Sequence, residues 1–173
     1  MTAADLIRKD FEDELNATRK ILAAVPDDKM DFQPHEKSMK LGRLAGHIAD
    51  LLNWTAIAVD ENKLDVAPGG KPAFTPLNPT SGKELVDYFD KNAAMAREKL
   101  AGLDSDRLED TWSLYRDGKL MFDMPRWKVL MTFNLAHIVH HRAQLGVYLR
   151  LNGIAVPGVY GPSQDDKDAA AAK

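Results

Sequence analysis

The chain has 173 residues, of which 45% are hydrophobic and 28% are charged, the proportions of an ordinary globular domain. Its formal net charge is −3 and its basic residues are scattered, which argues against a nucleic-acid-binding surface. The absence of cysteine excludes disulfides, thiolate ligands and a cysteine nucleophile, so any metal must be held by histidine and carboxylate. The sequence shows no membrane span and no signal-peptide core, so we expect a cytoplasmic protein without a membrane partner.

Apolar residues recur at spacings of three, four or seven in four stretches, a pattern typical of amphipathic helices. Thr2 followed by Asp5 resembles a capping box before the first stretch, and Ser38 is the expected N-cap of the second. Ser81 and Glu84 form a capping-box pattern at the start of the third. We expect helices over residues 3–25, 39–59, 82–100 and from about 123 or 125 to 151.

The connections between these helices differ in length. A loop rich in proline and glycine covers residues 68–79 between the second and third helices. Asp117-Gly118 is a two-residue turn signal within residues 112–122, which predicts a short hairpin or extended excursion before the last helix. Residues 164–173 have nothing to bury and are expected to form a flexible tail. The sequence therefore predicts an all-α fold, a four-helix bundle over residues 1–163.

Two histidines in the last helix carry the strongest chemical signal. His137 and His141 are four residues apart, so they lie on one helix face with a rise of about 6 Å between them. This spacing allows two imidazoles to bind one metal ion. His47 lies on the apolar stripe of the second helix and is the natural third ligand if the two helices pack together. Apolar side chains of the last helix are expected on the same arc: Leu130, Phe133, Leu145, Tyr148 and Leu151.

Other interpretations of these histidines stay open. A histidine on an apolar helix face is more often a hydrogen-bonded core residue than a ligand, although burying two without a shared partner is costly. His140 could replace His141 through an i, i+3 pair, but the apolar stripe favours His141. His35 lies beside Pro34 in a loop and is expected at the surface.

Several polar residues near this face have a functional and a plain structural interpretation. Asn134 and Gln144 could hydrogen-bond a ligand or a substrate, or lie at the margin of the helix. Asp50 could orient an imidazole as an acceptor, but a solvated surface charge is the simpler interpretation. Arg142 is expected to form an ion pair or an interface contact. Trp54 and Trp127 are expected in the core.

Five segments together resemble the DinB/YfiT-like family of metal-dependent proteins, in order and with compatible spacing. The run HHRAQL and the ending PGVYGPS are the most specific parts of this resemblance. The segments are Asp31–Pro34, Ser38–Ile48, His137–Leu145, Tyr148–Arg150 and Pro157–Ser163.

The resemblance implies a four-helix bundle with one long crossover connection, commonly assembled as a homodimer. It also implies a divalent metal, zinc or nickel, bound by His47, His137 and His141. Some relatives use this site to activate a low-molecular-weight thiol for transfer, whereas others are known only as DNA-damage-inducible proteins.

Three hypotheses follow for the activity. In the first, the metal lowers the pKa of a thiol, which attacks a small electrophilic substrate. In the second, water is the nucleophile and the reaction is hydrolysis. In the third, the protein is a non-catalytic metal- or ligand-binding module of a stress response, with no residue assigned to catalysis. Metal binding requires neutral imidazoles, so occupancy is expected to fall as the pH drops below roughly 6.5.

Overall fold

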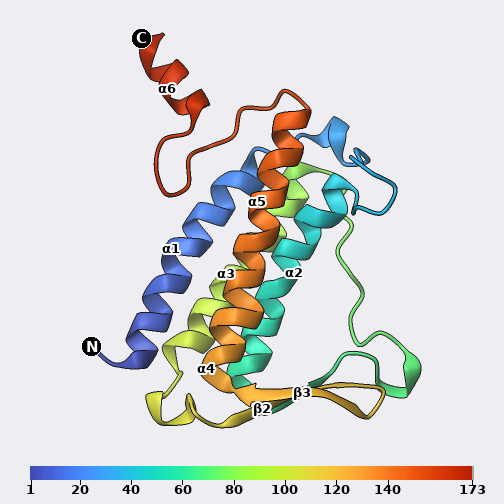
Figure 1. Ribbon diagram of the computed structural model, residues 1–173, viewed down its shortest axis with the longest axis vertical. Helices are drawn as coiled ribbons and strands as arrows, with labels where there is room; N and C mark the ends of the chain where they lie inside the picture. Colours follow the sequence, from blue (N-terminus) through green and yellow to red (C-terminus); the bar gives the residue numbers. More distant parts are fainter. Residues whose placement is uncertain (173) are drawn as a thin grey trace.

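The computed structural model describes residues 1–172 and is mostly helical, with one small three-stranded sheet at one end (Figure 1). Its α-helices are α1 (Ala3–Ala23), α2 (Leu41–Asp60), α3 (Gly82–Ala101), α4 (Arg126–Lys128), α5 (Ala136–Leu151) and α6 (Gln164–Ala171). A π-helix, η4 (Val129–Leu135), joins α4 to α5, and the short 3-10 helices are η1 (Asp27–Lys29), η2 (Pro68–Gly70) and η3 (Ser105–Arg107). The strands are β1 (Lys63–Asp65), β2 (Thr111–Arg116) and β3 (Lys119–Pro125).

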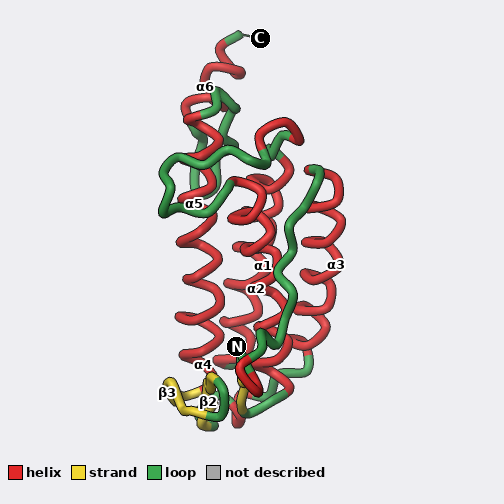
Figure 2. Tube along the Cα trace, turned by 90° about the vertical axis from the view of Figure 1, so that its right-hand side faces the viewer, coloured by secondary structure: helices red, strands yellow, loops and turns green. Residues whose placement is uncertain are grey.

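The long helices lie side by side, with α1 and α5 running in one direction and α2 and α3 in the other (Figure 1). Both α2 and α1 contact α3 and α5. Because α2 and α3 run the same way, residues 61–81 must return along the length of the helices, and Figure 2 shows a long loop running lengthwise beside them. This crossover segment, residues 61–81, becomes one wall of the candidate site.

The predicted helix starts are confirmed for α1 and, in part, for α3. The Thr2 side chain accepts a hydrogen bond from the Asp5 backbone N–H, and the Asp5 carboxylate accepts one from the Thr2 N–H. In α3 the Ser81 side chain accepts from the Glu84 N–H, as predicted. The Glu84 carboxylate, however, accepts from the Thr80 N–H at 2.7 Å, one residue upstream of the expected position.

The predicted N-cap of the second helix is wrong. Helix α2 begins at Leu41, and its N-cap position is occupied by Lys40, which makes no side-chain cap. Backbone carbonyls of the preceding loop take over this role. Leu41 N–H donates to the Phe32 carbonyl at 2.8 Å, and Gly42 N–H donates to the Met30 carbonyl at 2.9 Å. Because these first-turn donors are satisfied, Ser38 is not needed as a cap.

The last helix begins later than expected, because β3 continues through Pro125, which pairs with Thr111. Its π-helical turn also changes which residues share a face, since a uniform advance of 100° per residue does not hold there. The expected apolar arc is confirmed for Leu130 and Leu145, which are buried, but Leu151 is 61% exposed. Trp127, expected in the core, is 39% exposed.

The predicted hairpin is confirmed, and it belongs to a larger sheet than the sequence indicated. Strands β2 and β3 are antiparallel around Asp117 and Gly118, both at positive φ, and β1 adds to β2 in parallel. The carboxylate of Asp65, at the end of β1, accepts hydrogen bonds from the backbone N–H groups of Asp117 and Gly118. The all-α expectation is therefore corrected: a short parallel strand follows α2 and is fixed to the hairpin turn.

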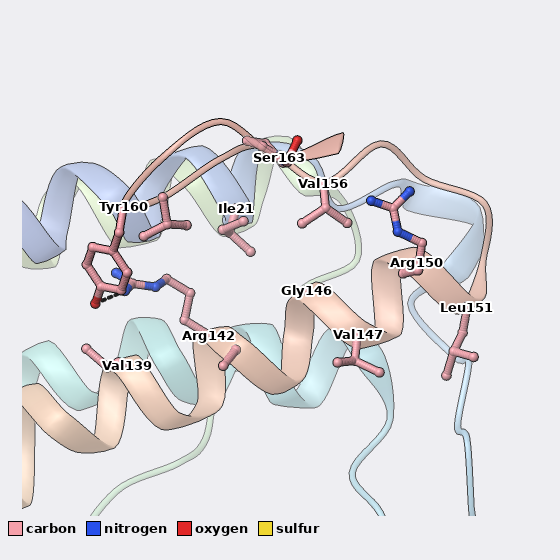
Figure 3. Close-up of a pocket in the computed structure, with 13 residues that line it drawn as sticks. Ile21, Val139, Arg142, Gly146, Val147, Arg150, Leu151, Val156, Tyr160 and Ser163 are labelled. Atoms are coloured by element: carbon pink, nitrogen blue, oxygen red, sulfur yellow. Dashed lines mark hydrogen bonds between the residues drawn. The ribbon is translucent and has the colours of Figure 1, made fainter. Parts of the chain in front are cut away.

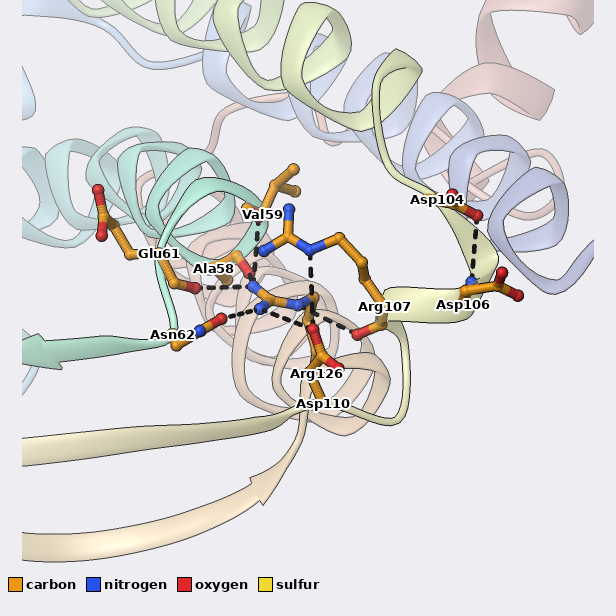
Figure 4. Close-up of polar contacts among 9 residues, drawn as sticks. All are labelled: Ala58, Val59, Glu61, Asn62, Asp104, Asp106, Arg107, Asp110 and Arg126. Atoms are coloured by element: carbon orange, nitrogen blue, oxygen red, sulfur yellow. Dashed lines mark hydrogen bonds and ion pairs between the residues drawn. The ribbon is translucent and has the colours of Figure 1, made fainter.

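A buried arginine joins this sheet to the helices. Arg126 is fully buried and donates through Nη1 to the backbone carbonyls of Val59 at 3.2 Å and Glu61 at 2.7 Å, and also to that of Ala58 (Figure 4). Its Nε donates to the Arg107 carbonyl, and Asp110 lies 3.7 Å from Nη2. The carbonyls of Ala58, Val59 and Glu61 lie at the C-terminal end of α2, where no backbone N–H of the helix remains to donate to them. Arg126 therefore holds the end of α2 against the hairpin.

The described C-terminal residues after Ser163 form α6, which is capped by Ser163 and Asp166 and has no buried residue. The predicted boundary between a domain of residues 1–163 and a flexible tail stays a prediction, and Lys173 lies outside the described residues. Over residues 1–172, no helix combines the length and the apolar character needed to cross a bilayer.

Candidate metal centre

Three of the five histidines meet between α2 and α5. One ring nitrogen from each of His47, His137 and His141 lies within 4.8 Å of those of the other two. The Nε2 atoms of His137 and His141 are 2.9 Å apart, and the ring centroid of His47 lies 4.8 Å from that of His141. The expected packing of the second helix against the last one therefore brings the three residues together, and the group could hold one divalent ion.

The local sequence allows this close approach on the α2 side. His47 follows Gly46, where a Cβ atom would lie 2.5 Å from the backbone carbonyl oxygen of Leu77. Real side chains do not tolerate such a contact, so only glycine lets the crossover segment lie directly against α2 here. The position of His47 beside this segment thus depends on the preceding residue.

On the other side, the π-helix η4 ends directly before the two histidines of α5. Within it, Ala136 N–H bonds to the Met131 carbonyl, five residues back, instead of the usual four. Such wide turns occur frequently at functional sites, because each one rotates the residues that follow relative to those before it. Here the rotation sets the direction in which His137 and His141 leave the helix.

The three imidazoles favour the neutral form that metal ligation requires. Burial lowers the pKa of His47 from 6.5 to about 4, and the nearby His141, His137 and Arg43 add to this effect. Burial is also the main cause of the lowered pKa values of His137 and His141. Loss of metal through protonation is therefore expected at a lower pH than the value near 6.5 predicted from ordinary histidines.

The outward-facing nitrogens of the α5 pair have hydrogen-bond partners. His141 Nδ1 lies 2.7 Å from Gln144 Oε1, and the backbone carbonyl of Phe133 accepts a hydrogen bond from His137. Acceptors in these positions fix the tautomer that leaves Nε2 free to bind a metal. His140 is exposed and lies 3.1 Å from the same Gln144 side chain, through its own Nε2. Gln144 therefore orients the cluster, whereas His140 lies outside it. His35 is exposed, as predicted.

A cavity of about 460 Å³ opens beside His47, between α2 and the crossover segment. Its apolar lining includes Trp54 and Phe74. The ring of Trp54 stacks on that of Phe133, with 5.9 Å between the ring centroids. A cavity of this size accepts a small organic molecule. The remaining polar lining residues are Arg43, Asp50, Asn53, Thr75 and Tyr88.

The polar wall of this cavity was missed by the sequence interpretation, except for Asp50. The Asp50 carboxylate accepts hydrogen bonds from the Leu77 N–H at 3.1 Å and the Tyr88 hydroxyl at 3.0 Å. It is therefore neither a free surface charge nor a partner of an imidazole; it holds the crossover segment against α2 and α3. Arg43 precedes His47 by one helical turn, so helical spacing could have placed it on the same face.

Asn134 lies in η4 with its side chain fully buried, and neither amide atom has a hydrogen-bond partner among the described residues. It therefore lies inside the protein and not at a helix margin. A buried amide without partners lowers the stability of the fold, and this one lies one turn before His137.

A second cavity, of about 480 Å³, lies between α5 and the chain from Val156 onwards, with Ile21 of α1 also in its lining (Figure 3). Its lining is mostly apolar, and its central cation, Arg142, is already paired. Arg142 forms the predicted ion pair, at 2.6 Å to Glu14, and donates to the Tyr160 hydroxyl at 2.7 Å. Because its charge is satisfied and no histidine of the cluster reaches it, this cavity is not the candidate metal centre.

The fold is mostly helical, and three histidines lie together beside a cavity large enough for a small molecule. These features define the class of protein as a helical protein with a candidate metal site. The model of the DinB family matches residues 1–171, and the chain belongs to this family. The predicted resemblance is thereby confirmed.

Individual relatives agree with this assignment. The chain is 29% identical over 164 residues to the "Uncharacterized protein YrdA" of Bacillus subtilis (strain 168), covering 94% of this chain and 90% of that protein. A DinB-like protein from Bacillus cereus ATCC 10987 has a similar structure, with a TM-score of 0.68, 26% identity and coverage of 89% and 95%. The DinB-like protein YjoA of Bacillus subtilis, at 19% identity and a TM-score of 0.68 over 89% and 96%, supports the fold alone.

Proposed function

We propose that the protein is a metal-dependent enzyme in which His47, His137 and His141 hold one divalent cation, zinc or nickel. The observation that carries this proposal is the convergence of three imidazole nitrogens beside a cavity. Nitrogen donors of this kind suit both metals. Three protein ligands would leave a position for a reactant, as in catalytic zinc sites.

The residues around the cluster fit such an ion. Burial keeps the imidazoles neutral, and the partners of His137 and His141 aim their Nε2 atoms toward one another. When bound, a divalent cation supplies Lewis acidity that lowers the pKa of a thiol or of water. The side chains of Trp54 and Phe74 would shield a small electrophile from bulk water in the adjoining cavity.

Metal content tests the ligand assignment. We expect about one zinc or nickel ion per wild-type chain and loss of this ion in His137→Ala, measured by elemental analysis after dialysis. His140→Ala is the matched control, because His140 follows His137 in the same helix, α5, but lies outside the cluster. Equal metal content in the two variants would contradict the assignment.

Transfer to a thiol and hydrolysis are distinguished by the dependence of turnover on an added thiol. The chain contains no cysteine, so the thiol must be an external, low-molecular-weight molecule. We propose transfer as the first candidate; a rate of electrophile consumption that is independent of added thiol would favour hydrolysis.

A non-catalytic metal- or ligand-binding module of a stress response is the second candidate function. It is favoured by the state of Asp50, the carboxylate in the cavity wall, whose two oxygens are engaged by Leu77 and Tyr88 and do not serve as a general base. Stoichiometric metal without turnover of any electrophile, with or without thiols, would support this alternative.

We further propose that the long helices form the four-helix bundle with a crossover connection that is typical of the resemblance, and that the protein acts in the cytoplasm. A homodimer is part of the same proposal. The exposed side chains of Val147 and Leu151 on α5 favour it, because apolar surface is commonly buried at such interfaces. Sedimentation at micromolar concentration should give twice the mass of one chain.

A further inference from the structure

Arg43 is a positively charged side chain in the wall of the cavity beside the histidine cluster. We propose that this cavity binds a small carboxylate-bearing molecule and that Arg43 is the anchor for its carboxylate. This inference rests on the proposed function, since it names the substrate class of the same site.

Among residues 1–172, the Arg43 guanidinium forms only a long ion pair, with Asp50. Its Nη1 atom is buried, yet in the part of the chain that the structure describes it makes no hydrogen bond. The nearest carboxylate oxygen, Oδ2 of Asp50, is 3.8 Å away, beyond hydrogen-bond range. A buried donor on a cation is costly to leave unmade. A ligand that accepts from it would remove this cost.

The Asp50 carboxylate is engaged by other hydrogen-bond donors. Its Oδ2 accepts from the Leu77 N–H and its Oδ1 accepts from the Tyr88 hydroxyl. Turning the carboxylate toward Arg43 would break contacts that hold the crossover segment in place. The Asp50 carboxylate is thus near enough to offset part of the positive charge of Arg43. It does not, however, accept a hydrogen bond from the Nη1 donor of Arg43.

Two exposed arginines of the protein form direct ion pairs. Arg19 binds both carboxylate oxygens of Asp90 at 2.8 Å, and Arg97 binds Glu12 at 2.6 Å. These ion pairs are on the surface, where water could have taken the place of either partner. Arg43 differs from these two arginines because its guanidinium lies in the wall of a cavity and, among the described residues, has a carboxylate oxygen only at 3.8 Å. This is the arrangement expected of a ligand-binding group.

Arg43 also lies close to the histidine cluster along α2. It precedes His47 by four residues on α2, so the two side chains leave the same helix face about 6 Å apart. The charge of Arg43 is also one of the causes that lower the pKa of His47. If a ligand binds Arg43 through its carboxylate, a ligand atom about 6 Å from that carboxylate would therefore lie at the histidine cluster.

The remaining lining defines the rest of the ligand. Trp54 and Phe74 offer aromatic surface, and the volume of about 460 Å³ suits a small organic acid with an apolar body. Guanidinium groups recognise carboxylates through two parallel hydrogen bonds, which an uncharged amide cannot match. The cavity therefore should discriminate an acid from its amide.

This discrimination can be measured with matched probes. Dissociation constants of phenylacetate, 3-phenylpropionate and 4-phenylbutyrate would be compared by calorimetry with those of the corresponding amides, on zinc-loaded full-length protein. We expect at least one acid to bind about 10-fold or more tightly than its amide, and Arg43→Gln to remove this preference. Arg43→Lys should retain part of it, and Arg116→Gln, on an exposed strand residue, should retain all of it.

A further variant, His137→Ala, separates this inference from the proposed function. If the acid preference survives in His137→Ala, the carboxylate is bound by Arg43, whether or not the histidines hold a metal. If Arg43→Gln keeps both its metal and its acid preference while His137→Ala loses the preference, the carboxylate binds at the histidines and the anchor is wrong. Equal affinity for acid and amide in the wild-type protein across all three pairs would also overturn it. Metal content of each variant tests the proposed function independently.

Discussion

The protein contains two buried polar regions that are built on opposite principles. Around Arg126, the guanidinium donates to the carbonyls of Ala58 and Val59 in α2, of Glu61 directly after it, and of Arg107 at the end of η3. In the cavity beside His47, by contrast, the Nη1 atom of Arg43 has no hydrogen-bond acceptor among residues 1–172. Both arginines could have been paired by the same chemistry. The difference indicates that the first region serves stability and the second is kept open for a ligand.

The largest expected effect is the removal of the Arg126 network. Arg126→Met preserves much of the side-chain volume but leaves the carbonyls of Val59 and Glu61 without donors. We expect a loss of about 3–5 kcal/mol in the free energy of unfolding, measured by urea denaturation. The metal content of the folded variant should be unchanged.

Arg116→Met, on the exposed end of β2, is the control and should change stability by less than about 0.5 kcal/mol. A loss below about 1 kcal/mol in Arg126→Met would show that the network is not a main support of the fold. Loss of metal by the folded variant would show that the two regions are not separate.

The pH dependence of stability tests the histidine region. His47 has a pKa of about 4 in the folded protein but about 6.5 when unfolded, so between these values the unfolded chain binds more protons. The free energy of unfolding of the metal-free protein should therefore be constant above pH 6.5 and fall by on the order of 1 kcal/mol per pH unit below it. His137 and His141, whose pKa values are also lowered, add to the same trend.

Urea denaturation between pH 8 and pH 4.5 measures this dependence, and His47→Gln should make it shallower. His35→Gln is the control, since His35 is exposed and should leave the curve unchanged. Stability that rises as the pH falls through this range would contradict the burial of neutral imidazoles.

Gly46→Ala tests how closely the cavity depends on the crossover segment. The added Cβ would lie 2.5 Å from the Leu77 carbonyl oxygen, so the segment must move away from α2. We expect a loss of about 1–3 kcal/mol in stability and weaker binding of the carboxylate probes. Gly146→Ala, whose Cβ would lie 3.6 Å from its nearest neighbour, should be neutral or stabilising. Equal effects of the two substitutions would exclude the close contact at Gly46.

The smallest expected effect concerns Asn134. Its amide is buried without partners, so Asn134→Leu should raise the free energy of unfolding by about 1 kcal/mol. Asn92→Leu provides the contrast, because Asn92 is buried but donates to the Ala49 carbonyl at 3.2 Å. Thermal denaturation should therefore show opposite signs for the two variants. Destabilisation by Asn134→Leu would indicate that the amide is satisfied in solution.

The parts of this protein that could be predicted from the sequence are those encoded by local spacing. His137 and His141 share a face because four residues make about one helical turn, and the Asp117-Gly118 turn follows from residues that accept positive φ. The apolar stripe on which His47 lies predicts it as the third ligand. Arg43 carries the same kind of signal, one turn before His47, but its significance depends on the missing partner, which only the structure shows.

The remaining features depend on contacts between distant segments. Ser38 fits the local N-cap pattern, but the backbone carbonyls of Met30 and Phe32 accept the first-turn hydrogen bonds in its place. Strand β1 has three residues and exists because β2 lies beside it, and the role of Arg126 requires the end of α2 to meet the hairpin. The π-helix η4 has no simple sequence signal, so a regular helix placed Leu151 on the buried face when it is exposed.

The most direct test of the proposed metal centre is a crystal structure of the zinc- or nickel-soaked protein with data collected on both sides of the metal absorption edge. We expect one anomalous peak per chain, at about 2.1 Å from one ring nitrogen each of His47, His137 and His141. A peak bound by other residues, or no peak at these histidines in crystals grown at neutral pH with excess metal, would contradict it.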